Sequence, residues 1–285
     1  MRKKQKICDR LIPIVLIAVF LISSGMFLRD YLSYRQADDE YAALDRYMTA
    51  DGSGSPDGQN SENGGTGADN AADGNSQKHR STVPSWALPF DFFYEPLHVD
   101  LNALSEKNPD FVGVIDIPAL EIRYPVVKSH DNEEYLHRTF DGTQNAAGCI
   151  FLDKDAPEDL SAQNTFVYGH NMKNGSMFGK LKEFRESGAV DRFPYVFLYT
   201  PEGTFRYRIF ACSEVEASHS IYLGFRDGEG YDAYIRMARN LSAYSMPEND
   251  EVDFAERPKL LSLSTCTGSS HTMRYVVQCA LVEKN

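Results

Sequence analysis

A cysteine and an arginine near the C-terminal end of the chain are of the right types and spacing for catalysis. Cys266 directly follows the β-prone run 260–265, and Arg274 lies near the start of a second β-prone run. A polar stretch with a glycine separates them, so an antiparallel hairpin with Cys266 beside Arg274 is predicted. A thiol nucleophile next to a guanidinium can attack a carbonyl and stabilise the resulting oxyanion. An arginine that begins a strand is more often a solvated flank, and only its position across the hairpin favours a catalytic role.

A cysteine nucleophile also needs a group that gives a proton to the leaving group. Among the seven histidines, His170 directly follows the β-prone run 165–168 and a glycine, which predicts a histidine presented at a strand end. His271, five residues after Cys266, is the local alternative, and a solvated loop histidine is its simpler interpretation. The other histidines have no comparable setting: His79, His98, His130, His137 and His219.

The chain from residue 86 to residue 285 is predicted to be a single catalytic domain of mainly β class. About eight short β-prone runs alternate with helical stretches at 99–107, 177–185 and 231–244. This pattern is typical of a closed β-barrel with peripheral helices. Three cysteines lie inside the apolar runs and are expected to be buried: Cys149, Cys212 and Cys279. A disulfide between the first two is left open.

The N-terminal part of the chain has the pattern of a membrane anchor. Residues 1–10 carry five Lys or Arg, and residues 11–28 are uncharged and apolar. Eighteen helical residues span about 27 Å, close to the hydrocarbon thickness of a bilayer. The charge bias predicts a cytoplasmic tail (1–10), a single transmembrane helix (11–28) and an extracellular catalytic domain. A cleaved signal peptide is the alternative. Residues 29–50 look like a helical continuation at the membrane surface.

Residues 51–85 consist mainly of Gly, Ser, Asn and Asp, and we predict a disordered linker that holds the domain away from the membrane. The formal net charge of −12 argues against nucleic acid as a partner, because phosphate binding needs clustered Lys and Arg. The cysteines and histidines do not pair with zinc-like spacing, and the carboxylates form no calcium loop. Neither a metal nor a cofactor is therefore expected.

Together these residues resemble a known family. The most specific piece is Leu263-Ser264-Thr265-Cys266 followed by Arg274, which is similar to the Leu-x-Thr-Cys and strand-start Arg of class B sortases. Further similar segments, in chain order, are 124–127, 131–132 with 135–136, 148–153, 164–178 and the helix at 231–244. The resemblance covers roughly residues 100–282.

The resemblance implies a closed eight-stranded sortase-type barrel and a membrane-anchored cysteine transpeptidase of a Gram-positive bacterium, a thiol peptidase that also acts as an acyltransferase. Its partners would be surface proteins with a C-terminal sorting signal of the Pro-x-Thr type, and an amine of peptidoglycan or its precursor. Carried over by position, Cys266 is the nucleophile, His170 the general acid and base, and Arg274 the oxyanion group. Four positions match the family's substrate groove: Asn132, Tyr168, Ser264 and Thr265.

Two other functions remain open on sequence alone. The same chemistry can polymerise pilin subunits when the acceptor is a lysine of another protein. A surface protein with the same barrel can also be hydrolytic only, or not catalytic at all. The intact Cys266, His170 and Arg274 argue against loss of catalysis.

Overall fold

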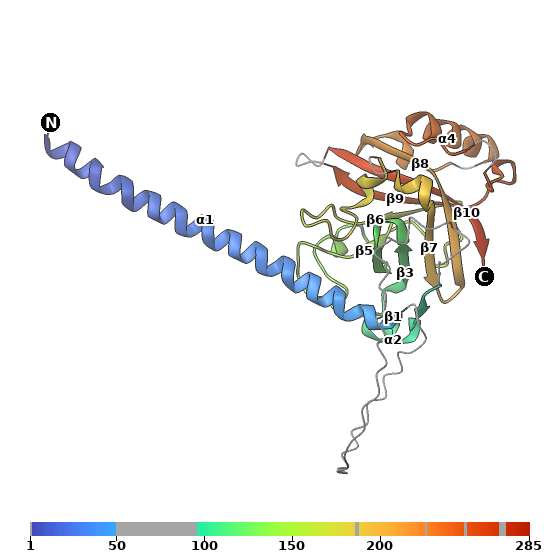
Figure 1. Cartoon of the computed structure of the whole chain (residues 1–285), viewed down its shortest axis with the longest axis horizontal. Coiled ribbons are helices and arrows are strands. Elements are labelled where there is room, and N and C mark those ends of the chain that lie inside the picture. Colours follow the sequence, from blue (N-terminus) through green and yellow to red (C-terminus); the bar gives the residue numbers. More distant parts are fainter. Residues whose placement is uncertain (1, 50–95, 186–187, 226, 248–249, 268–271) are drawn as a thin grey trace, which may run out of the picture.

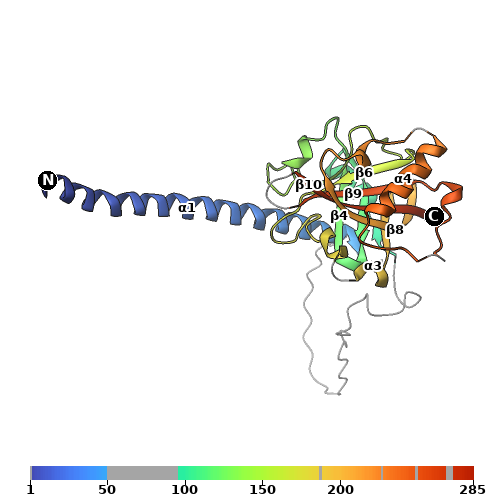
Figure 2. The ribbon, with the colours of Figure 1, turned by 90° about the horizontal axis from the view of Figure 1, so that it is seen from above.

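The computed structural model describes residues 2–49, 96–185, 188–225, 227–247, 250–267 and 272–285. A long helix, α1 (Arg2–Leu44), extends from a globular body (Figures 1 and 2). It is followed by the short helix η1 (Asp45–Tyr47) and by strand β1 (Met48–Thr49). The predicted linker 51–85 and two histidines of the sequence analysis, His79 and His271, lie outside the described residues.

The body is a closed barrel of eight strands, as predicted, in the order β10-β8-β7-β3-β4-β5-β6-β9. Closure removes the unpaired edges of an open sheet. The strands are β3 (Phe111–Ile117), β4 (Ile122–Val127), β5 (Ile150–Leu152), β6 (Asn164–Tyr168), β7 (Tyr195–Thr200), β8 (Gly203–Glu216), β9 (Leu260–Thr267) and β10 (Met273–Lys284). Two neighbouring pairs are parallel, β4 with β5 and β6 with β9, and the others are antiparallel.

Short helices lie in the connections between the strands. They are α2 (Leu101–Lys107), η4 (Pro118–Leu120), η5 (Glu134–Leu136), η6 (Leu181–Arg185), α3 (Ala189–Arg192), η7 (Ser220–Tyr222), α4 (Gly228–Leu241) and η8 (Phe254–Glu256). The helix predicted over 177–185 is wrong at its start, because Met177 has a left-handed backbone (φ 55°) and only η6 is helical. The helix predicted over 231–244 is α4, three residues earlier at each end.

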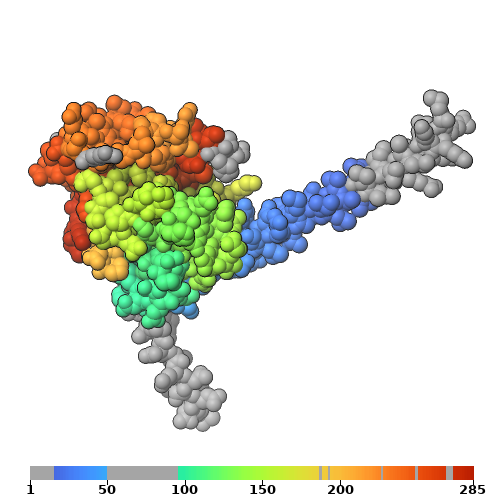
Figure 3. All heavy atoms as spheres, turned by 180° about the vertical axis from the view of Figure 1, so that it is seen from behind, coloured from blue at the N-terminus to red at the C-terminus, as the bar shows by residue number. Residues whose placement is uncertain are grey.

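The barrel has apolar residues on both sides of its wall. Leu261 and Leu263 of β9 belong to the interior cluster, whereas the neighbouring Leu260 belongs to a second cluster with Tyr231 and Ile235 of α4. Successive side chains of β9 point to opposite faces of the sheet, so β9 contributes both to the barrel interior and to the cluster under α4. In Figure 3 the orange part of the chain, which contains α4, covers one side of the body. Three cysteines, Cys149, Cys212 and Cys279, are fully buried and free, so the disulfide left open above does not form.

From Leu16 onward the apolar part of α1 is exposed, with Phe27 keeping 75% of its surface. Among the described helices, α1 is the one long and apolar enough to cross a membrane, a property that an N-terminal signal sequence shares. The predicted transmembrane helix 11–28 and most of the helix predicted over 29–50 form this one helix, which ends at Leu44.

The C-terminal end of α1 packs on the barrel, with Ala37, Tyr41 and Leu44 buried. Next to it, β1 pairs with β2 (His98–Val99) in a two-stranded antiparallel sheet. Thr49 is opposite His98, so the chain leaves and re-enters the described body at one small sheet. Contacts of α1 and β1 therefore fix the barrel against the C-terminal end of α1.

Candidate active site

The β9–β10 hairpin brings the thiol and the guanidinium together as predicted. Cys266 pairs directly with Arg274 in the antiparallel register. Directly opposite residues project from the same face of a sheet, and both side chains are partly buried here. Arg274 Nη1 donates a hydrogen bond to the carbonyl oxygen of Met273 at 3.1 Å, which helps to fix the position of the guanidinium.

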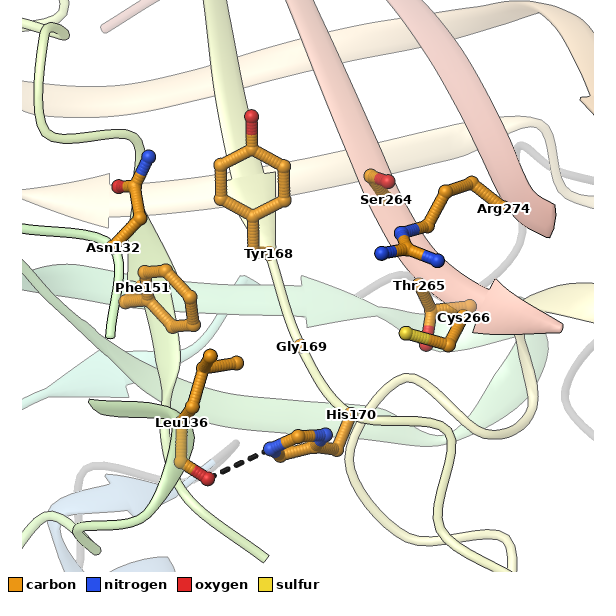
Figure 4. A pocket seen from close by; sticks show the side chains of 10 residues that line it. All are labelled: Asn132, Leu136, Phe151, Tyr168, Gly169, His170, Ser264, Thr265, Cys266 and Arg274. Carbon is orange, nitrogen blue, oxygen red and sulfur yellow. Dashed lines mark hydrogen bonds between the residues drawn. The ribbon is translucent and has the colours of Figure 1, made fainter. Parts of the chain in front are cut away.

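His170 reaches the same place through a parallel pair of strands. Tyr168, the last residue of β6, pairs with Ser264 of β9, and Gly169 N donates to Ser264 O at 3.2 Å. His170 and Cys266 each come two residues later in strands that run the same way, so both project from one end of the pair. Figure 4 shows Cys266 between the Arg274 guanidinium and the His170 imidazole.

Gly169 is needed for this placement. A Cβ atom on residue 169 would lie 2.4 Å from Ile150 Cδ1 and 2.8 Å from the Phe178 ring. Carbon atoms in contact are normally 3.5–4.0 Å apart, so a side chain at this position requires the Ile150 side chain, the Phe178 ring or the strand end that carries His170 to shift.

The imidazole of His170 is held by a backbone carbonyl. Its Nε2 lies 2.7 Å from the carbonyl oxygen of Leu136, at the end of η5 (Figure 4). A carbonyl oxygen only accepts hydrogen bonds, so Nε2 carries the proton and Nδ1 is the basic nitrogen of the neutral ring. The ring of His137 lies next to it, with centroids 6.3 Å apart.

A pocket of about 210 Å³ joins these groups. Its lining contains all seven predicted site residues and three that the sequence analysis did not select. The lining residues are Asn132, Leu136, Phe151, Tyr168, Gly169, His170, Ser264, Thr265, Cys266 and Arg274. The pocket is apolar on the side of Leu136 and Phe151 and polar around the thiol. A peptide bound in an extended conformation can place a side chain in this pocket while its backbone carbonyl group faces the thiol.

One carboxylate orders two of the predicted groove residues. Asp153 Oδ2 accepts hydrogen bonds from Asn132 Nδ2 at 3.1 Å and from the Tyr168 hydroxyl at 2.9 Å. Asn132 Oδ1 in turn accepts from Lys154 N at 2.7 Å. Burial, and then the Asp153 carboxylate, raise the pKa of Tyr168, which keeps the phenol protonated. Asp153 was missed, although a carboxylate directly after a predicted strand was visible in the sequence.

The two remaining groove residues differ. The Ser264 hydroxyl lies 2.8 Å from the hydroxyl of Tyr222. Burial raises the pKa of Tyr222, and the hydrogen bond with Ser264 and the charge of Arg274 partly oppose this increase. Tyr222 is a second residue that the sequence analysis missed, because no pattern near η7 marks it. Thr265 is only 3% exposed, and the alternation along β9 places its side chain on the inner face with Leu263. The pocket nevertheless counts Thr265 among its lining residues.

Within the described ranges, no three His, Cys, Asp or Glu side chains are close enough to hold a metal ion. The chemistry of this pocket is that of a thiol, an imidazole and a guanidinium.

Comparison with known proteins gives consistent matches. Residues 115–282 match the family model of the sortase domain. Sortase B of Listeria monocytogenes is 30% identical over 188 residues, which is 65% of this chain and 75% of that protein. The crystal structure of Clostridium perfringens sortase B is 28% identical, covers 64% of this chain and 99% of its own, and has a TM-score of 0.59. A Staphylococcus aureus sortase B-substrate complex, 22% identical, has the same fold over 64% of this chain and 84% of its own, with a TM-score of 0.59. With the thiol, imidazole and guanidinium brought into one pocket on this barrel, the chain belongs to the sortase family, as a class B sortase.

Proposed function

We propose that this class B sortase, a cysteine transpeptidase of cell-wall anchoring, cleaves a Pro-x-Thr-type sorting signal after its Thr. It then joins the Thr carboxyl group to an amine of peptidoglycan or its precursor. The observation that carries the proposal is the single pocket lined by Cys266, His170 and Arg274.

In the first half of the reaction, the Cys266 thiolate attacks the carbonyl carbon of the Thr residue. A C–S bond forms, and the carbonyl oxygen takes up negative charge that the Arg274 guanidinium stabilises. The C–N bond then breaks as imidazolium His170 gives a proton to the departing amine. The products are a thioester on Cys266, a neutral imidazole and the released C-terminal part of the substrate.

In the second half, an acceptor amine attacks the thioester and gives a proton to His170. The C–S bond breaks, Cys266 leaves as a thiolate, and a new amide bond forms. The hydrogen bond from Nε2 to Leu136 O supports this role, because it fixes a proton on Nε2 and so makes Nδ1 the basic nitrogen of the neutral ring. The apolar lining from Leu136 and Phe151 supports transfer over hydrolysis, since it limits access of water to the thioester.

The sorting signal is proposed to lie along Asn132, Tyr168, Ser264 and Thr265. The Asp153 hydrogen bonds to Asn132 and Tyr168 hold both polar groups before the peptide arrives. We further propose that α1 anchors the chain in the cell membrane, with the N-terminus cytoplasmic and the barrel outside. Both substrates are found at that membrane face.

The test is mass spectrometry of the full chain in detergent, mixed with Pro-x-Thr-type peptides and a panel of amines. We expect Cys266 to gain the mass of the N-terminal peptide fragment and to pass it to an amine. The Cys266→Ala chain is the matched control and should gain nothing. Transfer to a lysine-bearing peptide in preference to wall-type amines would instead indicate pilin polymerisation, and release of free acid alone would indicate a hydrolase. The absence of any adduct or cleavage would overturn the proposal.

A further inference from the structure

The segment that follows the apolar part of α1 is built into the barrel. We call residues 33–49 the docked segment. Four of its side chains, Ala37, Tyr41, Leu44 and Met48, are buried in the same cluster as the barrel interior. Arg123 of β4 also donates a hydrogen bond to the carbonyl oxygen of Met48 at 3.3 Å. Figures 1 and 2 both show this end of α1 against the body.

One carboxylate of the docked segment holds the middle of the loop that follows η5. We call residues 137–148 the clamped loop. Glu40 accepts two hydrogen bonds from it, from Thr139 Oγ1 to Oε2 and from Asp141 N to Oε1, each 2.8 Å long. Thr139 is fully buried, and its hydroxyl lies closer to Glu40 than to its other acceptor, the carbonyl oxygen of Thr143 at 3.3 Å. Hydrogen bonds to an ionised carboxylate are about twice as strong as neutral ones.

Two further contacts hold the rest of the clamped loop. Asn145 Nδ2 donates to the carbonyl oxygen of Ser33 at 2.8 Å. The Tyr41 hydroxyl donates to the carbonyl oxygen of Gly148 at 2.6 Å, and lies 3.3 Å from Cys149 Sγ. Gly148 has a left-handed backbone (φ +57°), which a residue with a side chain adopts only with strain. The docked segment therefore contacts the clamped loop at its middle and at its C-terminal end.

The loop after His170 is tied to the same segment. Asn174 Nδ2 donates to the Asp38 carboxylate at 3.1 Å. The rings of Tyr41 and Tyr124 pack edge to face, with centroids 5.2 Å apart, and the Tyr124 hydroxyl accepts from Met177 N at 3.1 Å. Both loops that flank the imidazole thus rest on one helix.

The clamped loop begins directly after Leu136, whose carbonyl oxygen accepts the His170 Nε2 hydrogen bond. Backbone hydrogen bonds join the two ends of the clamped loop next to Leu136: Cys149 N donates to Tyr135 O, and Asn145 N donates to His137 O. We propose that the docked segment is a positioning element of the active site, and that Glu40 is its main positioning residue for His170. The proposal rests on the acid and base role proposed above for that histidine.

The test uses the full chain in detergent with Glu40→Ala and Glu40→Gln. The control is Asp39→Ala, which removes the adjacent carboxylate from an exposed position. For cleavage of a Pro-x-Thr-type peptide, we expect Glu40→Ala to lower kcat about tenfold with KM within twofold, because binding is kept and proton transfer is misaligned. Glu40→Gln keeps one acceptor oxygen and should lose only about threefold. Asp39→Ala should match the wild type.

The thermal midpoint of each chain separates positioning from folding. A wild-type kcat in Glu40→Ala would overturn the proposal. A loss that follows only the fraction unfolded at the assay temperature, or an equal loss in Asp39→Ala, would overturn it as well. If the wild-type chain cleaves no peptide, the proposed function has failed on its own, and amide hydrogen exchange still tests the clamp. Faster exchange across 137–148 in Glu40→Ala than in Asp39→Ala would then uphold the clamp, and unchanged exchange would overturn it.

Discussion

Two pairs of residues meet in the pocket by different routes. Cys266 and Arg274 face each other across one antiparallel hairpin, joined by a short loop. Cys266 and His170 come from strands that lie far apart in the sequence and run parallel. The first pair is positioned by a local ladder, whereas the second depends on strand register, a glycine and a carbonyl from a third segment. We therefore expect His170, the proposed acid and base, to be more easily displaced from the pocket than Arg274.

The largest effects are expected where a reacting group is removed. Cys266→Ala should abolish cleavage of a fluorogenic sorting peptide, and His170→Ala should lower kcat at least about 1000-fold, because proton transfer is lost. Circular dichroism should show an intact fold in both, since both side chains are only partly buried. His271→Ala should be close to wild type. An essential His271 with a dispensable His170 would reverse our assignment.

A smaller loss is expected at the local pair. Arg274→Ala should lower kcat about 100-fold, in the range measured when one oxyanion donor is removed. Arg274→Lys keeps the charge but not the planar fork of donors, and should recover only part of the loss. Steady-state kinetics with one peptide checks both. A lysine variant with full activity would show that charge alone is sufficient at this position.

The long-range pair can be disturbed without touching a reacting group. Gly169→Ala places a Cβ 2.4 Å from Ile150 Cδ1 and should destabilise the fold by about 1–3 kcal/mol, as overpacking does. It should also lower kcat about tenfold, because His170 is the next residue. Gly224→Ala is the matched control, since no heavy atom lies within 4 Å of its added Cβ. Urea unfolding and peptide cleavage measure both effects, and equal behaviour of the two variants would contradict the role of Gly169.

The smallest effect is expected for the predicted linker. Deleting residues 51–85 from the full chain should leave peptide cleavage within about twofold of wild type. Thr49 and His98 are already paired, and a shorter connection between them costs little conformational entropy. Cleavage assays in detergent check this. A large loss would show that this stretch contributes to the pocket or to the docking of α1.

The local parts of the site could be predicted from the sequence for a clear reason. Alternation and a polar loop define a hairpin, and a hairpin defines which residues face each other, so the Cys266–Arg274 pair followed directly. His170 was identified by its place after a strand and a glycine, but that strand's partner was unknown. Asp153 and Tyr222 were missed because each acts through a contact with a residue distant in sequence.

The sequence by itself determined the elements of this protein: the apolar helix, the β-prone runs of a mainly β domain, the hairpin, and a family resemblance that named the reacting residues. Hydrophobic periodicity and turn residues depend on neighbours only a few positions away in the sequence. A sequence motif can likewise be recognised without knowing any contact between distant residues. Only the tertiary structure decided that β6 runs parallel to β9 and that Leu136 O holds the imidazole. It also decided that α1 packs on the barrel. These contacts join segments far apart in the chain, and burial and hydrogen bonding select them only once the barrel has closed.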